Sequence, residues 1–254
     1  MLVKTTIMTR KFTILLALLS IYIGVTAQQT RYEEFAFGDF TTEGFTLPYR
    51  YIAPEVVDGK QPALVIFLHG RHASGTDNLT PITRKEVRRV ADFVKSNIYA
   101  HYLVPQCPYD RRWAEKRGED GSIGMSVVLK RWIDDYVANN NIDPKHIYIM
   151  GVSLGGGGVW RMLSDNPETF AAAITVASVP RRVDPVAVAK TPLLCIIGED
   201  DDVAMPSVVK PFIDAINDNN GNANLIILEG LDHGEACRNA FTEPNLRWLF
   251  KRLL

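Results

Sequence analysis

The chain has 254 residues, of which 28 are basic and 29 acidic, so its net charge is near −1. Because there is no basic excess, nucleic acid and anionic membrane surfaces are poor candidates as partners. The three cysteines are too few for a disulfide scaffold, and their spacing does not match a zinc site. The sequence therefore predicts no metal site.

Residues 1–27 differ from the rest and predict a secretory signal peptide. Basic residues precede an apolar stretch at positions 12–25, and small residues up to Ala27 offer a cleavage site before Gln28. The alternative, an uncleaved anchor, is disfavoured because a spanning helix needs about 20 apolar residues. Cleavage would leave 25 basic and 29 acidic side chains in one domain, residues 28–254. We expect this domain to be secreted or periplasmic and free of the membrane; its oligomeric state is not indicated.

Apolar runs bounded by Gly, Pro and Asp alternate with helical patterns along this domain, which is typical of an α/β protein. We predict a mostly parallel sheet of about eight strands with helices on both faces. The predicted strands are residues 47–53, 63–68, 100–104, 146–150, 172–176, 193–197 and 224–228, with 35–37 as an antiparallel edge. The predicted helices are residues 84–96, 125–139, 156–164, 206–218 and 243–254. Only residues 177–190 separate two of these strands, which leaves no room there for a large lid.

The pentapeptide Gly151-Val152-Ser153-Leu154-Gly155 directly follows the predicted strand 146–150. A strand that ends in this pattern and enters a helix predicts a nucleophile elbow, in which a strained turn exposes the serine hydroxyl. Glycine is needed on both sides because side chains two positions away would clash. The glycine run 155–158 favours close packing of this helix on the sheet, since no G-x-x-x-x-G-K pattern accompanies it.

A serine hydroxyl becomes a useful nucleophile when a histidine takes its proton and a carboxylate orients that histidine. The chain presents these residue types in the order serine, acid, histidine: Ser153, the acidic run 199–202 and His233. His233 follows the last predicted strand, where a loop can return over the sheet. Within the acidic run, Asp201 is the predicted triad acid and Asp202 is the alternative.

An acyl-transfer site also needs two N–H donors aimed at the oxyanion. We predict the amide of Leu154, at the start of the helix, and the amide of Arg71, in the loop after strand 63–68. The candidate substrate contacts are His69, Gly70, Trp113 and Arg181. A tryptophan and an arginine at the rim of the site would suit a phenolic or acidic acyl group, although arginines are usually surface charges.

Taken together, these residues resemble the α/β-hydrolase superfamily over nearly the whole predicted mature chain. Segments 67–70, 75–78 and 104–108, with Trp113, resemble a narrower group of small secreted carboxylesterase/phospholipase-like proteins. That group includes dienelactone-hydrolase-like and feruloyl-esterase-like members and proteins labelled predicted peptidases. The resemblance implies an α/β-hydrolase fold with Ser153 as nucleophile, His233 as base and Asp201 as acid.

The leading hypothesis is a secreted serine hydrolase that cleaves carboxylic esters, of small molecules or linked to polysaccharide, through an acyl-enzyme without a cofactor. One alternative is a serine peptidase of the same fold. Another is an inactive carbohydrate-binding relative. Cys107 and Cys237 both fall near the expected active-site edge, so a disulfide between them is a further possibility in an oxidising compartment.

Overall fold

Eight strands form one mostly parallel sheet in the part of the chain that the computed structural model describes, residues 32–118, 120–251 and 253–254. The predicted signal peptide lies outside the described residues. Phe37–Leu254 is one compact unit. In order across the sheet, the strands are β1 (Ala36–Thr42), β2 (Phe45–Ile52), β4 (Ala100–Pro105), β3 (Ala63–Leu68), β5 (Ile147–Val152), β6 (Ala172–Val176), β7 (Leu193–Gly198) and β8 (Ala223–Leu228).

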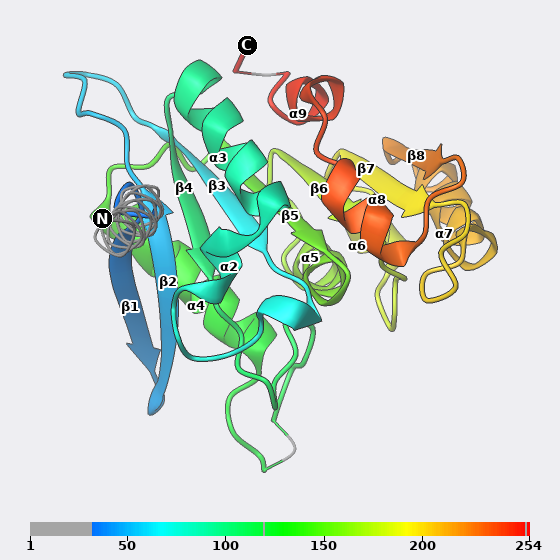
Figure 1. Cartoon of the computed structure of the whole chain (residues 1–254), viewed down its shortest axis with the longest axis horizontal. Helices are drawn as coiled ribbons and strands as arrows, with labels where there is room; N and C mark the ends of the chain where they lie inside the picture. The colour runs from blue at the N-terminus through cyan, green and yellow to red at the C-terminus, as the bar shows by residue number, and fades with distance from the viewer. Residues whose placement is uncertain (1–31, 119, 252) are drawn as a thin grey trace, which may run out of the picture. The chain divides into compact units, whose positions relative to one another are not determined.

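Helices cover both faces of this sheet (Figure 1). One layer consists of α4, α5, α6 and α7, which contact one another in that order, and the other contains α3, α8 and α9. Their bounds are α2 (Thr80–Thr83), α3 (Lys85–Asn97), α4 (Met125–Asn139), α5 (Leu154–Asp165), α6 (Pro185–Val188), α7 (Pro206–Asp218), α8 (His233–Asn239) and α9 (Glu243–Leu249), with a 3₁₀ turn η1 (Arg71–Ala73). The predicted α/β-hydrolase architecture is confirmed.

The central strands are buried along their whole length because helices lie on both sides of them. β3, β5 and β7 carry uninterrupted apolar runs, as expected for a parallel sheet covered on both faces. β3 to β8 run parallel, whereas β2 pairs antiparallel with β4. The loops that follow β3, β5 and β7 therefore meet at one edge of the sheet, which is where ligands bind in open α/β sheets.

Element boundaries differ from the sequence predictions at the two ends of the chain. The first strand extends to Thr42, and α9 ends at Leu249 instead of continuing to residue 254. The short helix α8, which begins at His233, was not predicted. Between β6 and β7 the chain forms only the four-residue helix α6, so the absence of a large lid at that position is confirmed.

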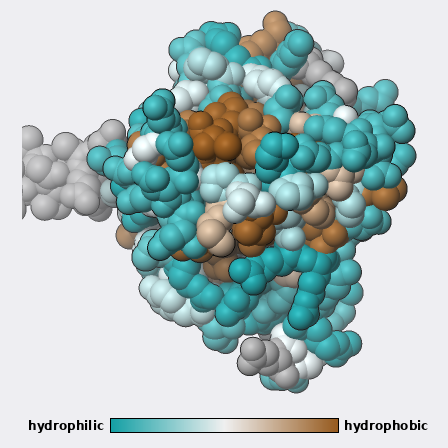
Figure 2. All heavy atoms as spheres, turned by 90° about the vertical axis from the view of Figure 1, so that its right-hand side faces the viewer, coloured by the Kyte–Doolittle hydropathy of each residue, from teal (hydrophilic) through white to brown (hydrophobic). Residues whose placement is uncertain are grey.

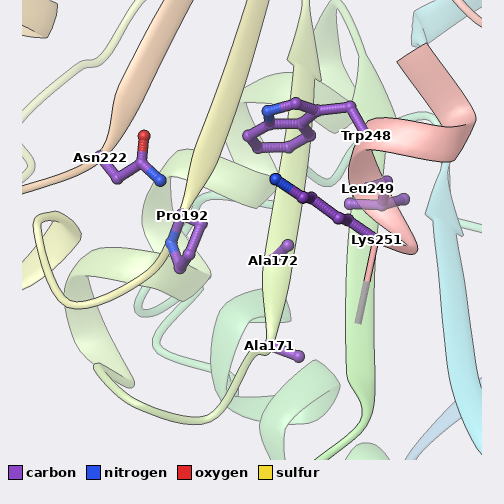
Figure 3. Close-up of a pocket in the computed structure, with 7 residues that line it drawn as sticks. All are labelled: Ala171, Ala172, Pro192, Asn222, Trp248, Leu249 and Lys251. Carbon is purple, nitrogen blue, oxygen red and sulfur yellow. The ribbon is translucent and has the colours of Figure 1, made fainter. Parts of the chain in front are cut away.

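A hollow at the opposite edge of the sheet is remote from the serine. It has a volume of about 150 Å³ and lies at the amino ends of β6, β7 and β8, beside Ala172, Pro192 and Asn222. Trp248 and Lys251 point over these strand ends (Figure 3). Ser153 follows the carboxyl end of β5, so this hollow is separate from the elbow.

The surface shown in Figure 2 carries several apolar patches divided by hydrophilic side chains. Large apolar side chains in α7, β8 and the loop before α7 are partly exposed, among them Val203 (61%), Val208 (49%) and Ile227 (47%). No helix in the described part of the chain is both long and apolar enough to cross a membrane.

Candidate active site

Ser153 occupies the sharp turn between β5 and α5. Its backbone angles, φ 51° and ψ −114°, are sparsely populated for a residue with a side chain. The conformation is held because the Ser153 amide donates to the Val176 carbonyl at 2.9 Å, while the next residue already begins the helix. The predicted strand, turn and helix context of the serine is therefore present.

Both glycines of the elbow are required by close backbone contacts. A Cβ on Gly151 would lie 2.6 Å from the carbonyl atoms of Gly155, and a Cβ on Gly155 would lie 1.9 Å from the Leu68 oxygen. Further along the helix, a Cβ on Gly158 would lie 2.5 Å from the Trp113 Cβ. The prediction that this glycine run serves close packing is confirmed, except at Gly157, where a Cβ would meet only Ser178 Oγ at 3.7 Å.

His233 lies between the serine and a carboxylate. Its Nε2 is 2.9 Å from Ser153 Oγ, and its Nδ1 is 3.0 and 2.9 Å from the two carboxylate oxygens of Asp201. Asp201 is buried, and its Oδ1 also accepts hydrogen bonds from the amides of Val203 and Ala204. Asp202 is exposed. The geometry thus brings Asp201, and not Asp202, to the histidine.

The loops that carry Asp201 and His233 are tied to each other. The Asp200 amide donates to the Leu231 carbonyl at 3.1 Å, and the Glu199 carboxylate accepts from the Gly230 amide at 2.9 Å. The loops approach so closely that a Cβ on Gly198 would lie 2.2 Å from the Leu231 oxygen. Glu199 and Asp200 therefore hold the two loops together, so the acidic run has a structural use beyond solvation.

A capping box fixes the start of α8, where His233 is the first helical residue. Asp232 accepts from the Glu235 amide at 2.7 Å, and Glu235 accepts from the Asp232 amide at 3.2 Å. This pattern satisfies two backbone donors that a helix start otherwise leaves unpaired. The D-x-x-E spacing around His233 was the sequence signal that would have revealed this helix.

The loop after β3 runs beside the serine. A Cβ on Gly70 would lie 3.5 Å from Ser153 Cβ, and η1 begins at Arg71. The amides of Arg71 and Leu154 stand at the first positions of η1 and α5, where a helix leaves N–H groups unpaired. No described residue accepts a hydrogen bond from either amide. Both predicted oxyanion donors are thus on segments adjacent to Ser153 and open to a ligand.

Two of the predicted substrate contacts are buried and do not face a cleft. Trp113 is fully buried because it packs on Gly158, and its indole N–H donates to the His69 carbonyl at 3.1 Å. His69 is 1% exposed, and its ring bonds to the backbone of Gly70 and Cys107. The prediction that Trp113 and His69 contact substrate is therefore wrong: both side chains support the loop from below.

The cysteines are free, so the disulfide considered between Cys107 and Cys237 is not formed. Burial raises the pKa of each of these two thiols to about 12. A thiol needs to lose its proton to attack a carbonyl, so neither thiol is suited to act as a nucleophile at neutral pH. The described residues contain no group of three or more His, Cys, Asp or Glu side chains that could hold a metal ion.

Two hollows flank Ser153. The larger, about 350 Å³, has apolar residues in its lining, among them Ala114, Val179 and Val203. The smaller, about 130 Å³, lies on the side of Gly70, His233 and Cys237. The geometry leaves room on both sides of the serine, as a substrate cleaved in its middle requires.

Arginines line both hollows. Arg112 and Arg181 line the larger hollow, and Arg71, Arg84 and Arg238 line the smaller. Glu86, 3.5 Å from Arg84, is the one carboxylate among the described lining residues. Of the predicted substrate contacts, Gly70 and Arg181 line these hollows. Arg112 was not predicted, because an arginine in a loop gives no sequence signal for a ligand.

The loop that presents Arg181 is anchored to the helix after the serine. The buried Arg161 of α5 donates to the carbonyl oxygens of Arg181 at 3.3 Å and Arg182 at 2.8 Å. Trp160 donates to the Ser178 carbonyl at 3.4 Å. The wall of the larger hollow is thus braced by α5, the helix that follows Ser153.

Comparison with known proteins agrees with this architecture. The model of the dienelactone hydrolase family matches residues 57–244, most of the chain. The chain belongs to the dienelactone hydrolase family. Membership of this α/β-hydrolase family supports a hydrolase function of the esterase type.

Solved structures share the fold at low sequence identity. A thermostable esterase superposes with a TM-score of 0.77 at 24% identity, covering 87% of this chain and 64% of its own. A ferulic acid esterase gives a TM-score of 0.68 at 14% identity, covering 87% and 98%. The acylaminoacyl peptidase of Pyrococcus horikoshii gives 0.64 at 17%, covering 87% and 42%.

Among curated proteins, poly(3-hydroxyalkanoate) depolymerase C of Paucimonas lemoignei is 31% identical over 68 residues. That alignment covers 27% of this chain and 16% of the depolymerase. The chain thus matches only a small part of this relative's length.

Proposed function

We propose that the protein is a serine hydrolase that cleaves carboxylic esters through an acyl-enzyme intermediate. The observation that carries the proposal is the continuous hydrogen-bonded series from Asp201 through His233 to Ser153 Oγ. A buried carboxylate, an imidazole and a serine at these distances have the geometry needed to activate a hydroxyl.

In the first half of the proposed reaction, Ser153 Oγ attacks the ester carbonyl carbon while His233 Nε2 takes the hydroxyl proton. The carbonyl oxygen gains the negative charge, and the amides of Leu154 and Arg71 donate to it; such a donor is worth about 3 kcal/mol in the transition state. The intermediate then expels the alcohol oxygen, which receives the proton from His233 Nε2. Asp201 stabilises the imidazolium and holds its Nδ1 proton throughout.

In the second half, water attacks the acyl carbon, and His233 Nε2 accepts a proton from that water. The tetrahedral intermediate collapses, the acid leaves, and Ser153 Oγ takes the proton back. Each step of this proposed reaction uses the ester, residues of the protein and water.

Ser153→Ala tests the mechanism directly on a panel of p-nitrophenyl and hydroxycinnamoyl esters. We expect the variant to lose roughly 10⁶-fold in kcat, because removal of the nucleophile leaves only binding and oxyanion stabilisation. Retention of full turnover by the variant would show that Ser153 is not the nucleophile. Peptide substrates in the same assay address the peptidase alternative, and failure of a fluorophosphonate probe to label Ser153 would favour an inactive binding protein.

We further propose that the preferred ester carries an anionic group. Five arginines and one carboxylate line the two hollows, although the chain as a whole has a slight negative charge. Arg112 and Arg181 border the larger hollow, and no described residue pairs with either guanidinium. An apolar body that ends in a carboxylate or phosphate would fit this lining.

Arg112→Ala and Arg181→Ala test this preference. Each should raise KM for an ester with a carboxylate about tenfold, which corresponds to a charge-assisted hydrogen bond of about 1.4 kcal/mol, and leave the neutral methyl ester of the same compound nearly unchanged. Arg182→Ala is the matched control because Arg182 is also exposed but is not among the residues that line the hollow. An equal effect on charged and neutral esters would contradict the proposal.

Export from the cytoplasm is also a proposal, supported by the basic, apolar and small residues in sequence at positions 1–27. Amino-terminal sequencing of protein recovered outside the cytoplasm should begin at Gln28. Recovery of the uncleaved chain in the cytoplasm would count against export.

A further inference from the structure

His69 is a buried histidine outside the proposed triad, and it makes two hydrogen bonds with its ring. Its Nδ1 lies 2.8 Å from the Gly70 carbonyl oxygen, and its Nε2 lies 3.0 Å from the Cys107 amide nitrogen. Both partners are backbone groups. The ring therefore links the loop after β3 to the loop after β4.

These partners determine the protonation of the ring. A backbone N–H can only donate, so Nε2 of His69 must be the acceptor from Cys107. The ring proton is then on Nδ1, which donates to Gly70. Burial lowers the pKa of His69 to about 4, so this neutral tautomer prevails at neutral pH.

The hydrogen bond to Gly70 orients the next peptide unit. In a planar trans peptide, the carbonyl and the following N–H point in opposite directions. The Gly70 oxygen is held on one side by His69 Nδ1–H and by the Ala73 amide at 3.0 Å. The Arg71 N–H consequently points away from these donors, and Gly70 and Arg71 line the hollow that contains Ser153.

The ring itself has little freedom to turn. Trp113 stacks edge-on against it with ring centroids 5.2 Å apart and donates to the His69 carbonyl. A Cβ on Gly155 would lie 2.8 Å from that same carbonyl oxygen. The residue is thus confined from the core side and from α5, so its hydrogen bonds are made in one orientation.

We propose that His69 is a positioning residue that orients the Gly70–Arg71 peptide so that the Arg71 N–H can stabilise the oxyanion. This inference rests on the proposed function, and it deepens the account of the same site. Its rival is a purely structural role, in which the ring only ties the two loops together through Cys107.

Two substitutions separate these roles because each keeps one of the two bonds. In His69→Asn, the side-chain amide nitrogen takes the place of Nδ1 and can still donate to Gly70. In His69→Gln, the longer side chain places its amide oxygen near Nε2, where it can accept from Cys107 but leaves Gly70 without its donor. A positioning role predicts that His69→Asn retains more turnover than His69→Gln. A purely structural role, through the bond to Cys107, predicts the reverse.

The measurements are kcat, KM and the affinity for a trifluoromethyl ketone, which forms a tetrahedral adduct with the serine. For His69→Gln we expect kcat and the ketone affinity each to fall about 100-fold, the size of a lost oxyanion donor, with KM within threefold of wild type. For His69→Asn we expect kcat and the ketone affinity each to stay within tenfold of wild type. Equal losses in the two variants without a change in ketone affinity would overturn the proposal.

A second pair of variants keeps the test informative if the His69 variants fail to fold. Arg71→Pro removes the N–H itself at a first helical position, where proline is tolerated, and Gly70 already has the extended backbone (φ −78°, ψ 173°) that proline favours before it. Relative to Arg71→Ala, we expect Arg71→Pro to lose about 100-fold in kcat. Equal activity of these two variants would overturn the proposal because no N–H would then need positioning.

The His69 and Arg71 variants can be combined in a double-mutant cycle. His69→Gln should cost little more in the Arg71→Pro background, since both changes remove the same donor. A full additional loss would show that His69 acts elsewhere. If Ser153→Ala retained turnover, the proposed function itself would fail; if only the His69 and Arg71 variants behaved like wild type, this inference alone would fail.

Discussion

The same substitution at two positions of α5 should have opposite effects on stability. Gly155→Ala would place a Cβ 1.9 Å from the Leu68 oxygen, 2.5 Å from the Leu68 carbonyl carbon and 2.8 Å from the His69 oxygen. Gly157→Ala, two residues later, would place a Cβ 3.7 Å from Ser178 Oγ, which is ordinary contact. Both glycines lie in the same helix, so the difference between the two changes in the free energy of unfolding measures the effect of the packing contact.

The expected magnitudes follow from these contacts. Alanine is favoured over glycine in a helix by about 1 kcal/mol, so Gly157→Ala should raise the free energy of unfolding by about that amount and Tm by about 2–4 °C. At Gly155 the clash is with backbone atoms that cannot rotate away. Overpacking there should lower the free energy of unfolding by about 3 kcal/mol.

The assay is urea unfolding of both variants, together with ester turnover. Gly155→Ala should also lose activity because the backbone it displaces continues into His69, Gly70 and Arg71, whereas Gly157→Ala should keep the elbow intact. Stability of Gly155→Ala within 1 kcal/mol of wild type would refute the packing argument. So would a loss of more than 1 kcal/mol in Gly157→Ala.

Further predictions concern the carboxylates and pH. Asp201→Asn should lower kcat roughly 10⁴-fold, because the histidine loses the carboxylate that orients it, while Asp202→Asn should stay within threefold; kinetics in which Asp202 mattered more would reverse the assignment. Stability should fall by up to about 3 kcal/mol between pH 6.5 and pH 4, because burial lowers the pKa of His69 to about 4 and only the unfolded chain takes up a proton there. In urea unfolding, His69→Gln should not show this loss of stability between pH 6.5 and pH 4. The same pH dependence in the variant as in wild type would contradict the assignment to His69. Trp113→Phe should lower the free energy of unfolding by about 1 kcal/mol through loss of its bond to the His69 carbonyl, measured in the same way.

The fold was readable because its strands are apolar runs of the right length between turn residues. β3, β5, β6 and β7 lie within one or two residues of their predicted positions, since burial on both faces demands an uninterrupted apolar run. α8 was missed because it has only seven residues and begins at His233 itself. Its signal was a local capping box, which an apolar pattern does not reveal.

The sequence by itself determined the fold class, the serine at the turn after β5, and the histidine after the last strand. These depend on chain order and local turn chemistry, which sequence records directly. The tertiary structure alone decided that Asp201 and not Asp202 meets His233, because that choice depends on the bonds between residues 199–200 and 230–231.

The tertiary structure also decided which of the predicted substrate contacts are buried. Trp113 and His69 resembled cleft residues in sequence, but the glycines of α5 let that helix approach so closely that both side chains lie beneath the loop. Arg112 reached the larger hollow without any sequence signal. Which residues face a ligand depends on distances between segments far apart in the chain, and only the packed structure sets those distances.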